Sequence, residues 1–451
     1  MSLIIPANTL ASGGFSVANS CRFNSASSDA LTKTLGSGGN RKTFTISLWT
    51  KPSSVSQQQM FLSADDNQFG FTNEPVIFFY ENNGGTEKPY IKWKPFYRDT
   101  SAWYHICLAV DTTQSTNTNR MKLYVNGSQV TEYFSTPTHP DQNQDLTWNT
   151  NVAHAIGRYS SSGGHYDGYM AEYVLIDGSA LAPTSFGEFD EDSGIWKPID
   201  VSGLTFGTNG FYLDFEDSSA LGNDAANSND WTVSNLTAID QSIDTCTTNF
   251  CTLNPLNVPA TNQPTFSEGN LQSISKDGAG SFGGSSTFVV SSGKWYLECK
   301  ALNATSGVGV TYNQGETART NNDATTLYEW IYRNNGKIGH VDDSTYGDTY
   351  TTNDIVGILL NLDDNELKFS KNGTLQNSGT AISITANQEY AIYHQDSTES
   401  GSNRSNFAFN FGSPSYSESG GETDGNGYGN FANAVPSGYY SLNTKNLSEF
   451  G

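Results

Sequence analysis

The sequence predicts an all-β protein built from two tandem antiparallel β-sandwiches of the jelly-roll type. Its composition is the first reason: of 451 residues, only 15% are charged, 12% are aromatic and 44 are glycine. Long amphipathic helices need more alanine, leucine, glutamate and lysine, whereas short strands joined by polar turns suit this composition. We therefore expect less than about 15% helix, well below the usual third.

Two Asn-Gly pairs, Asn126-Gly127 and Asn372-Gly373, are the second reason. They end the similar motifs Lys-Leu-Tyr-Val-Asn-Gly and Lys-Phe-Ser-Lys-Asn-Gly. Asn-Gly accepts the positive φ angles of a type I′ turn, so each pair predicts a tight hairpin. Each hairpin follows a long apolar segment that ends in aspartate, at residues 103–111 and 354–363. The same sheet pattern occurs twice, far apart in the chain, which predicts two domains.

In the first half, alternation places Phe44, Ile46 and Leu48 on one face of a half-buried strand. Aromatic-rich strands follow over residues 61–100, and the last strands lie near 153–157 and 168–177. We expect this domain to span residues 1–215, beginning with an irregular lead-in.

Residues 216–265 are rich in Asn, Asp, Ser and Thr without a sustained period, which predicts a connector. The second domain is expected over residues 266–451, where Trp295, Leu297 and Cys299 alternate inward on one strand. Five cysteines are too few and too scattered for a disulfide framework. Cys107 and Cys299 fit inert core thiols, because both lie in apolar strands.

The net charge of −23, from 23 basic and 46 acidic residues, disfavours nucleic acid as a partner. Binding to nucleic acid depends on neutralising phosphates with Lys and Arg. No continuous apolar stretch reaches the roughly 18–20 residues of a membrane span, so no membrane insertion is expected. Residues 1–6 lack the basic and apolar regions of a signal peptide, so we expect synthesis in a cytoplasm without standard export.

No catalytic site is expected. Retaining glycosidases need two carboxylates about 5–5.5 Å apart, and the compact candidate set is Glu188, Asp190 and Asp192. Gly187 and Gly194 flank this set, which favours a solvated acidic loop. Nucleophile-elbow and His-Glu-x-x-His motifs do not occur in the sequence.

Two family resemblances follow from these motifs. Residues 44–51, 102–111, 122–127 and 167–172 resemble the laminin-G and pentraxin type of concanavalin A-like domain. Residues 293–299, 307–310, 354–363 and 367–373 resemble a SPRY (B30.2) domain. The tandem, with segments such as 4–8, 185–198, 207–215 and 436–447, is similar to virion proteins of marine bacteriophages.

The first resemblance implies a calcium site, because many such domains hold Ca²⁺ with loop carboxylates and carbonyls. No cofactor is required, and calcium is the one candidate, with Asp65, Asp66, Asn126 and Asp167 as ligands. The Asn/Asp-rich stretch 223–230 is a further candidate region.

Aromatic side chains with nearby polar groups suit sugars and peptides. The sequence offers two such sets: Tyr90, Trp93, Phe96 and Tyr97 in the first domain, and Tyr328, Trp330 and Tyr332 in the second. Each set also fits a sandwich core, and the sequence leaves both interpretations open.

The resemblance implies a bacteriophage virion protein, with a tail-fibre or tail-appendage role in binding a host-surface glycan or protein. Other virion proteins and a homo-oligomer, with a trimer favoured, are the expected partners. The alternatives are a capsid decoration protein or head fibre, and a glycan depolymerase.

Overall fold

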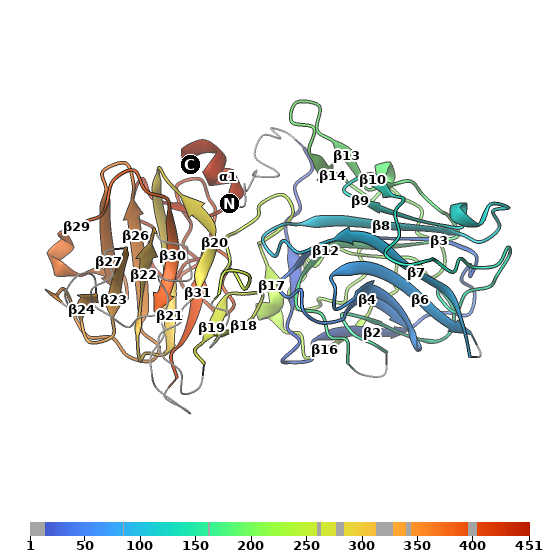
Figure 1. Ribbon diagram of the computed structural model, residues 1–451, viewed down its shortest axis with the longest axis horizontal. Coiled ribbons are helices and arrows are strands. Elements are labelled where there is room, and N and C mark those ends of the chain that lie inside the picture. Colours follow the sequence, from blue (N-terminus) through green and yellow to red (C-terminus); the bar gives the residue numbers. More distant parts are fainter. Residues whose placement is uncertain are drawn as a thin grey trace. The chain divides into compact units, whose positions relative to one another are not determined.

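The computed structural model describes residues 14–83, 85–160, 163–258, 263–276, 284–312, 328–339, 344–395 and 404–451. The chain forms two compact units that meet in sequence between Thr248 and Asn249. We call them the first and the second sandwich (Figure 1). Strand accounts for 42% and helix for 5%, which confirms the all-β prediction. The opening segment 4–8 of the phage-like pattern lies outside the described residues.

The first sandwich has two large sheets among its described residues, stacked as layers in Figure 1. One has the order β10 (Ser128–Val130), β9 (Met121–Val125), β8 (Tyr104–Asp111), β3 (Thr43–Pro52), β12 (Gly168–Asp177), β1 (Ser20–Phe23) and β17 (Gln241–Ser242), and β15 (Phe211–Leu213) also pairs with β12. The other has the order β16 (Thr232–Ser234), β2 (Ala30–Thr34), β11 (Ala153–Ile156), β4 (Gln59–Ala64), β5 (Asn67–Phe71), β6 (Val76–Asn83) and β7 (Thr86–Phe96). The remaining elements are the hairpin β13 (Gly187–Phe189) and β14 (Trp196–Pro198), and the 3₁₀ turns η1 (Asn117–Asn119), η2 (Pro183–Ser185) and η3 (Ala238–Asp240).

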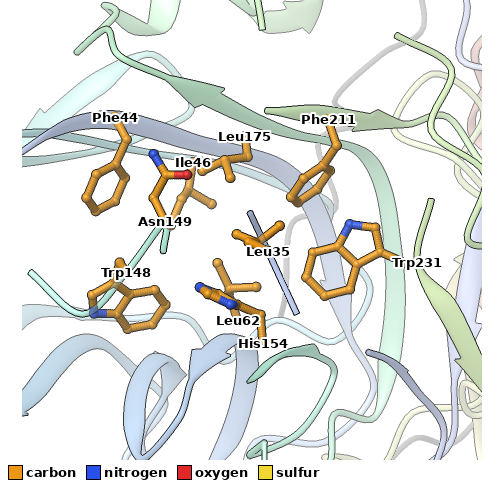
Figure 2. A pocket seen from close by; sticks show the side chains of 10 residues that line it. All are labelled: Leu35, Phe44, Ile46, Leu62, Trp148, Asn149, His154, Leu175, Phe211 and Trp231. Atoms are coloured by element: carbon orange, nitrogen blue, oxygen red, sulfur yellow. The ribbon is translucent and has the colours of Figure 1, made fainter. Parts of the chain in front are cut away.

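The core of the first sandwich lies between these two sheets. Phe44, Ile46 and Leu48 of β3 are fully buried in it, as predicted, but the expectation of a half-buried strand is wrong, because the residues that alternate with them are buried as well. A small cavity remains between the sheets, lined by side chains from both, including Phe44 of β3 and Leu62 of β4 (Figure 2).

The expectation of a connector over residues 216–265 is wrong for its first part. β16 pairs with β2, and β17 pairs with β1, so residues 216–248 complete both sheets of the first sandwich. Residues 249–258 belong to the second sandwich, where Leu253 bridges Ser286. These strands have two or three residues, which is too short to show a period in sequence.

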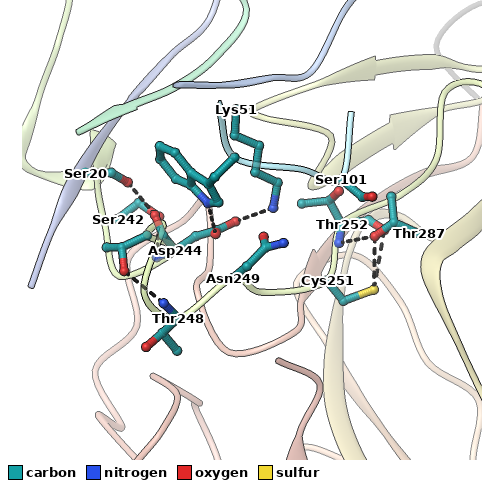
Figure 3. A network of polar contacts seen from close by, with 12 residues as sticks. Ser20, Lys51, Ser101, Ser242, Asp244, Thr248, Asn249, Cys251, Thr252 and Thr287 are labelled. Carbon is teal, nitrogen blue, oxygen red and sulfur yellow. Dashed lines mark hydrogen bonds and ion pairs between the residues drawn. The ribbon is translucent and has the colours of Figure 1, made fainter. Parts of the chain in front are cut away.

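A buried ion pair fixes the end of the first sandwich. Lys51 Nζ of β3 lies 2.8 Å from Asp244 Oδ2, and both side chains are almost fully buried (Figure 3). Trp103 Nε1 donates to the other carboxylate oxygen at 3.1 Å, and Ser20 Oγ donates to the Asp244 carbonyl at 2.6 Å. Segments far apart in sequence thus share one polar cluster inside an apolar domain.

The second sandwich also has two large sheets among its described residues. One has the order β18 (Thr265–Ser267), β19 (Gln272–Ile274), β31 (Asn406–Asn410), β21 (Lys294–Asn303), β26 (Ile355–Asn361), β27 (Glu366–Lys371) and β28 (Thr374–Leu375), and β29 (Ile382–Ser383) and β32 (Tyr440–Ser441) also join it. The other has the order β20 (Ser285–Val290), β30 (Tyr390–Gln395), β22 (Gly307–Thr311), β23 (Glu329–Arg333), β24 (Lys337–Gly339) and β25 (Ser344–Thr345). A 3₁₀ turn, η5 (Asn377–Gly379), and a short helix, α1 (Thr444–Phe450), complete this unit. Trp295, Leu297 and Cys299 are fully buried between the sheets, as predicted.

Both predicted Asn-Gly hairpins are present. Asn126 and Gly127 connect β9 to β10 with φ angles of 46° and 76°, and Asn372 and Gly373 connect β27 to β28 with φ angles of 48° and 80°. Positive φ at both central residues is the requirement of a type I′ turn. Cys107 and Cys299 are fully buried and form no disulfide among the described residues, so both are core thiols, as predicted.

Candidate functional site

The outward face of β7 in the first sandwich carries the candidate site. Side chains alternate along this strand, so Ile91 and Trp93 face the core while Tyr90 and Lys92 face outward. Phe96 lies at the end of the same strand, 46% exposed. On the other side of β7, residues 132–138 run antiparallel to it, and this pairing includes the bridges Tyr90–Thr138 and Trp93–Tyr133.

Four predicted ligand-binding aromatics do not form a surface. Trp93 and Tyr97 pack in the core of the first sandwich, 1% and 7% exposed, and Trp330 and Tyr332 in that of the second, 3% and 0% exposed. The core interpretation of the alternation is correct for them. Tyr328 remains 39% exposed beside the ring of Tyr312.

Two aromatic contacts occur along the outward face of β7. At one end, the Phe96 and Phe134 rings meet edge-to-face with centroids 5.9 Å apart, and the Arg98 guanidinium lies 4.4 Å from the Phe96 ring. Further along, Tyr80 of β6 meets its cross-strand partner Tyr90 edge-to-face at 5.5 Å, and Lys92 Nζ lies 5.5 Å from the Tyr90 ring. We call this set the β7 strip: Tyr80, Tyr90, Lys92, Phe96, Arg98 and Phe134.

The cations near the strip fall into two groups. Lys88 pairs with Asp141 at 2.7 Å, and Lys94 pairs with Glu132 at 2.8 Å. Lys92 and Arg98 form no ion pair with any described residue and lie over ring faces instead. Two cations therefore remain available to a ligand next to exposed aromatic rings.

Sequence reasoning found only part of the strip. Tyr90 and Phe96 are in the predicted cluster, whereas Tyr80, Arg98 and Phe134 are not. Tyr80 follows the buried Phe79 on β6, so strand alternation could have indicated it. Phe134 lies in a polar, proline-containing segment without periodicity, and its place beside Phe96 depends on tertiary pairing.

The residues predicted for calcium have different hydrogen-bond partners, and the calcium site stays a prediction. Asp65, Asp66 and Asp167 do not converge, because the described residues contain no group of three or more acidic, histidine or cysteine side chains that could hold a metal ion. The Asp167 carboxylate instead accepts from Ser25 N, Ser25 Oγ and Gln57 Nε2, each at 2.7 Å. Asn126 Oδ1 accepts from the His105 amide at 2.8 Å. These side chains stabilise loops and a hairpin.

The further candidate region, residues 223–230, is organised by Asp224. Its carboxylate accepts from the backbone amides of Tyr212, Ala226 and Asn229 at 2.9–3.0 Å. Asn and Asp side chains commonly stabilise turns in this way, so these hydrogen bonds explain why the segment is rich in Asn and Asp.

The acidic segment 188–192 spans the hairpin of β13 and β14. Lys197 Nζ lies 3.4 Å from Glu188 Oε1 and 3.2 Å from Asp190 Oδ2. Hydrogen bonds from the Ser193 amide and hydroxyl lower the pKa of Asp190 to about 2. A glycosidase needs one carboxyl that stays protonated as the general acid. The low pKa of Asp190 keeps its carboxylate ionised instead, and Glu188 is exposed beside a lysine. The pair therefore does not fit that chemistry.

His105 and Glu172 are further buried ionisable groups, and both contribute to the packing of the first sandwich. His105 is stacked between Trp49 and Trp196, its Nε2 lies 2.9 Å from Ser47 Oγ, and burial lowers its pKa to about 3. Glu172 occupies the bulge of β12 with φ of 48°. Burial raises its pKa to about 8, although the Tyr212 hydroxyl donates to it at 2.7 Å.

No helix among the described residues is long and apolar enough to cross a membrane.

Comparison with known families assigns both domains. Residues 23–184 match the family model of the concanavalin A-like lectin/glucanases superfamily, and residues 294–404 match that of the SPRY domain. The chain therefore carries a laminin G-type, concanavalin A-like domain followed by a SPRY domain. Both expected families are thus confirmed, whereas the phage origin stays a prediction. No match was found among curated proteins.

Solved structures match parts of the chain at low sequence identity. The SPRY domain of human HERC1 is 18% identical, with 35% of this chain and 96% of that one covered and a TM-score of 0.29. A heptameric SAP-like pentraxin from Limulus polyphemus is 16% identical, with 45% and 94% covered and a TM-score of 0.30. Similarity at this level carries no conclusion about ligand or partner.

Proposed function

We propose that this chain is a non-catalytic recognition protein whose β7 strip binds a cell-surface glycan. The contact between Phe96 and Phe134, which are 46% and 42% exposed, carries the proposal. Large apolar side chains that cluster on a surface usually mark an interaction site, whereas single exposed ones need no explanation. Here two phenylalanines and an arginine over one of their rings share one patch, and aromatic residues and arginine are enriched in the cores of interfaces.

An elongated ligand fits the geometry best. Phe96 lies six positions after Tyr90 on β7, which at about 3.3 Å per residue places the two ends of the strip roughly 20 Å apart. Aromatic rings offer apolar surface to the C–H faces of sugars, and Lys92, Arg98 and the tyrosine hydroxyls offer hydrogen-bond donors. An oligosaccharide chain has both features along its length. The family match to lectins and glucanases is compatible with such a ligand.

The biological setting is the second part of the proposal. We place the chain in a bacteriophage virion, as a tail-fibre or tail-appendage component that contacts the host surface and other virion proteins. The resemblance of the tandem to phage virion proteins supports this setting. Display as a homo-oligomer, with a trimer favoured, would turn weak contacts of single strips into avidity.

A glycan array followed by cell labelling tests the binding step. We expect the purified chain to bind a subset of extended glycans and to label cells that carry them. The double variant Phe96→Ala with Phe134→Ala should lose both signals. Phe189→Ala is the matched control, because Phe189 is 51% exposed on β13, away from the strip. Equal binding by the wild-type chain and the double variant would refute the proposal.

Particle imaging and a cleavage assay test the setting and the lack of catalysis. Few copies at the tail support attachment, whereas many copies over the head indicate a capsid decoration protein. A reducing-end assay on bound glycans should show no cleavage. Cleavage that disappears in Glu188→Gln or Asp190→Asn, with the fold preserved, would establish a depolymerase instead.

A further inference from the structure

The β7 strip is a basic surface on a strongly acidic chain. Along β7 and the two residues after it, the sequence has one acidic residue, Glu87, and four basic residues: Lys88, Lys92, Lys94 and Arg98. The whole chain has the opposite balance, with 23 basic against 46 acidic residues. Solubility does not require this concentration of cations, because the large negative net charge already provides it.

Three carboxylates lie beside these cations and limit how much negative charge a ligand can carry. Asp141 lies 2.7 Å from Lys88, and Glu132 lies 2.8 Å from Lys94. Glu87 accepts from a tyrosine hydroxyl of the strip at 3.3 Å. Because like charges repel at close range, a polymer with an anionic group on every unit would meet these carboxylates as well as the cations.

Lys92 and Arg98 are the cations that remain for a ligand, since neither forms an ion pair with a described residue. The Lys92 ammonium lies against the Tyr90 ring, toward one end of the strip. The Arg98 guanidinium lies against the Phe96 ring at the other end. A guanidinium is a planar fork that can bind a carboxylate through two parallel hydrogen bonds, whereas an ammonium acts as a point charge. The strip thus offers one free cation near each end, with the paired Lys94 between them in sequence.

The spacing of these charges points to a class of glycan, and this step rests on the proposed function of the strip. We propose that the ligand is an acidic, sparsely charged glycan, in which neutral sugars separate the carboxylates. One carboxylate binds Lys92 and another binds Arg98. The neutral sugars between them lie on the exposed rings, whose apolar surface suits C–H faces. A glycan with one uronic acid in each repeat has this chemistry. A neutral glycan lacks the anions, and a densely sulfated glycan carries more of them than the two free cations can pair.

Single-stranded nucleic acid is the rival ligand, because it also combines flat stacking surfaces with anionic groups. Its phosphate on every nucleotide would face the carboxylates of Glu87, Glu132 and Asp141. Its affinity also depends on the neutralisation of several phosphates at once, for which the strip has two free cations. The net charge of −23 opposes such a polymer further. The charges of the strip therefore favour the glycan, and DNA is a contrasting probe in the test.

Matched acidic and neutral forms of the same oligosaccharides test the charge requirement. The acidic probes are gellan and hyaluronan oligosaccharides, which carry one glucuronate per repeat, together with the glycan that binds most tightly on the array. Each acidic probe is compared with its form after reduction of the carboxylates to alcohols. Laminarin and dextran oligosaccharides are the neutral probes, and heparin and oligothymidylate are the densely charged ones. In calorimetric titrations of the full chain, we expect an acidic probe to bind and its reduced form to bind roughly tenfold more weakly or worse.

A double variant tests the two cations. Lys92→Gln with Arg98→Gln removes both free charges and keeps every ring of the strip. We expect it to bind the acidic probe roughly tenfold more weakly, and the reduced probe within about twofold of the wild type. Lys33→Gln with Lys122→Gln is the matched control, because it removes the same charge from β2 and β9, which do not pair with β7. The control should bind both probes like the wild type.

The outcomes distinguish this inference from the proposed function. Equal binding of the acidic and reduced forms, or binding of neutral probes alone, overturns the acidic ligand and leaves the strip as a site for neutral glycans. Binding of heparin or oligothymidylate as tightly as the acidic probe overturns the sparse spacing of charge. An equal loss in the two double variants overturns the roles of Lys92 and Arg98. Failure to bind any glycan refutes the proposed function itself, and this inference with it.

Discussion

Asn372 in the second sandwich repeats the contacts of Asn126 in the first. Asn126 Oδ1 accepts a hydrogen bond from the backbone amide of His105 at 2.8 Å, and the backbone amide of Asn126 donates to the His105 carbonyl at 2.9 Å. Asn372 makes the same two contacts with Ile355, both at 2.8 Å. In each case the side chain extends the sheet ladder past the hairpin, to the strand that precedes it. The Asn of each Asn-Gly pair therefore has two roles, the turn and this bridge.

Glycine at either position separates these roles, because it keeps the positive φ and removes the side-chain acceptor. We expect Asn126→Gly and Asn372→Gly to lower the free energy of unfolding of their own sandwich by about 1–3 kcal/mol, since a strand amide loses its partner. Asn126→Ala and Asn372→Ala should lower the free energy of unfolding by about 1–2 kcal/mol more than the glycine variants do, because alanine is strained at positive φ. Denaturant unfolding with a probe in each sandwich measures both effects. Equal stability of the glycine variants and the wild type would contradict the bridge.

The buried pair of Lys51 and Asp244 gives a second prediction. Asp244→Asn removes the carboxylate that lies 2.8 Å from the buried Lys51 ammonium, and breaking a buried ion pair in this way typically costs about 3–5 kcal/mol. We expect the first sandwich to unfold at a correspondingly lower denaturant concentration. Asp141→Asn is the control, because it breaks the solvent-exposed pair with Lys88, worth about 0–1 kcal/mol. Similar effects of the two variants would show that burial does not govern the Lys51 pair.

A third prediction tests the place of residues 216–248. Trp231 is 4% exposed and packs edge-to-face on Phe211 at 5.0 Å, so Trp231→Ala should cost about 3–5 kcal/mol. Val233, two residues further along, is 42% exposed, and Val233→Ala should stay within about 0.5 kcal/mol. Thermal and denaturant unfolding of the full chain compare them. If residues 216–248 formed a free connector, neither substitution would change the free energy of unfolding. That result would contradict the assignment of these residues to the first sandwich.

Glu172 gives a prediction for pH. Its pKa is raised from 4.5 to about 8 by burial, so its contribution to stability is complete below pH 4.5 and is lost as pH rises through about 8. Glu172→Gln keeps a neutral side chain at every pH. We expect similar stability of variant and wild type in acid, and above pH 8 a variant more stable by on the order of 2–4 kcal/mol. A constant difference between Glu172→Gln and the wild type at all pH values would contradict the shift.

The sequence predicted the structure best where a local residue pattern is compatible with only one conformation. Positive φ restricts the two hairpin tips to residues such as Asn and Gly, and alternation in long strands such as β3 identifies buried positions. The same rules failed for β16 and β17, because strands of two or three residues show no period. Their place depends on pairing with β2 and β1, 200 or more positions away in the chain.

The candidate site was only partly predictable, for a related reason. An aromatic residue on a strand faces either the core or the solvent, and composition alone does not say which. The structure divides the predicted cluster, with Trp93 and Tyr97 inside and Tyr90 and Phe96 outside. Phe134 joins Phe96 only through the pairing of residues 132–138 with β7. Among the proposed calcium ligands, Asp167 and Asn126 accept hydrogen bonds from nearby side chains and amides, and the calcium site stays a prediction.

Calorimetric titration of the purified chain with its best array glycan tests the central claim most directly. We expect saturable binding by the wild-type chain and by Phe189→Ala, and at least a tenfold loss, or about 1.4 kcal/mol, for Phe96→Ala with Phe134→Ala. Unfolding midpoints of all three proteins should agree closely, because the substituted side chains are about half exposed. Unchanged affinity in the double variant, with its fold intact, would contradict recognition through the β7 strip.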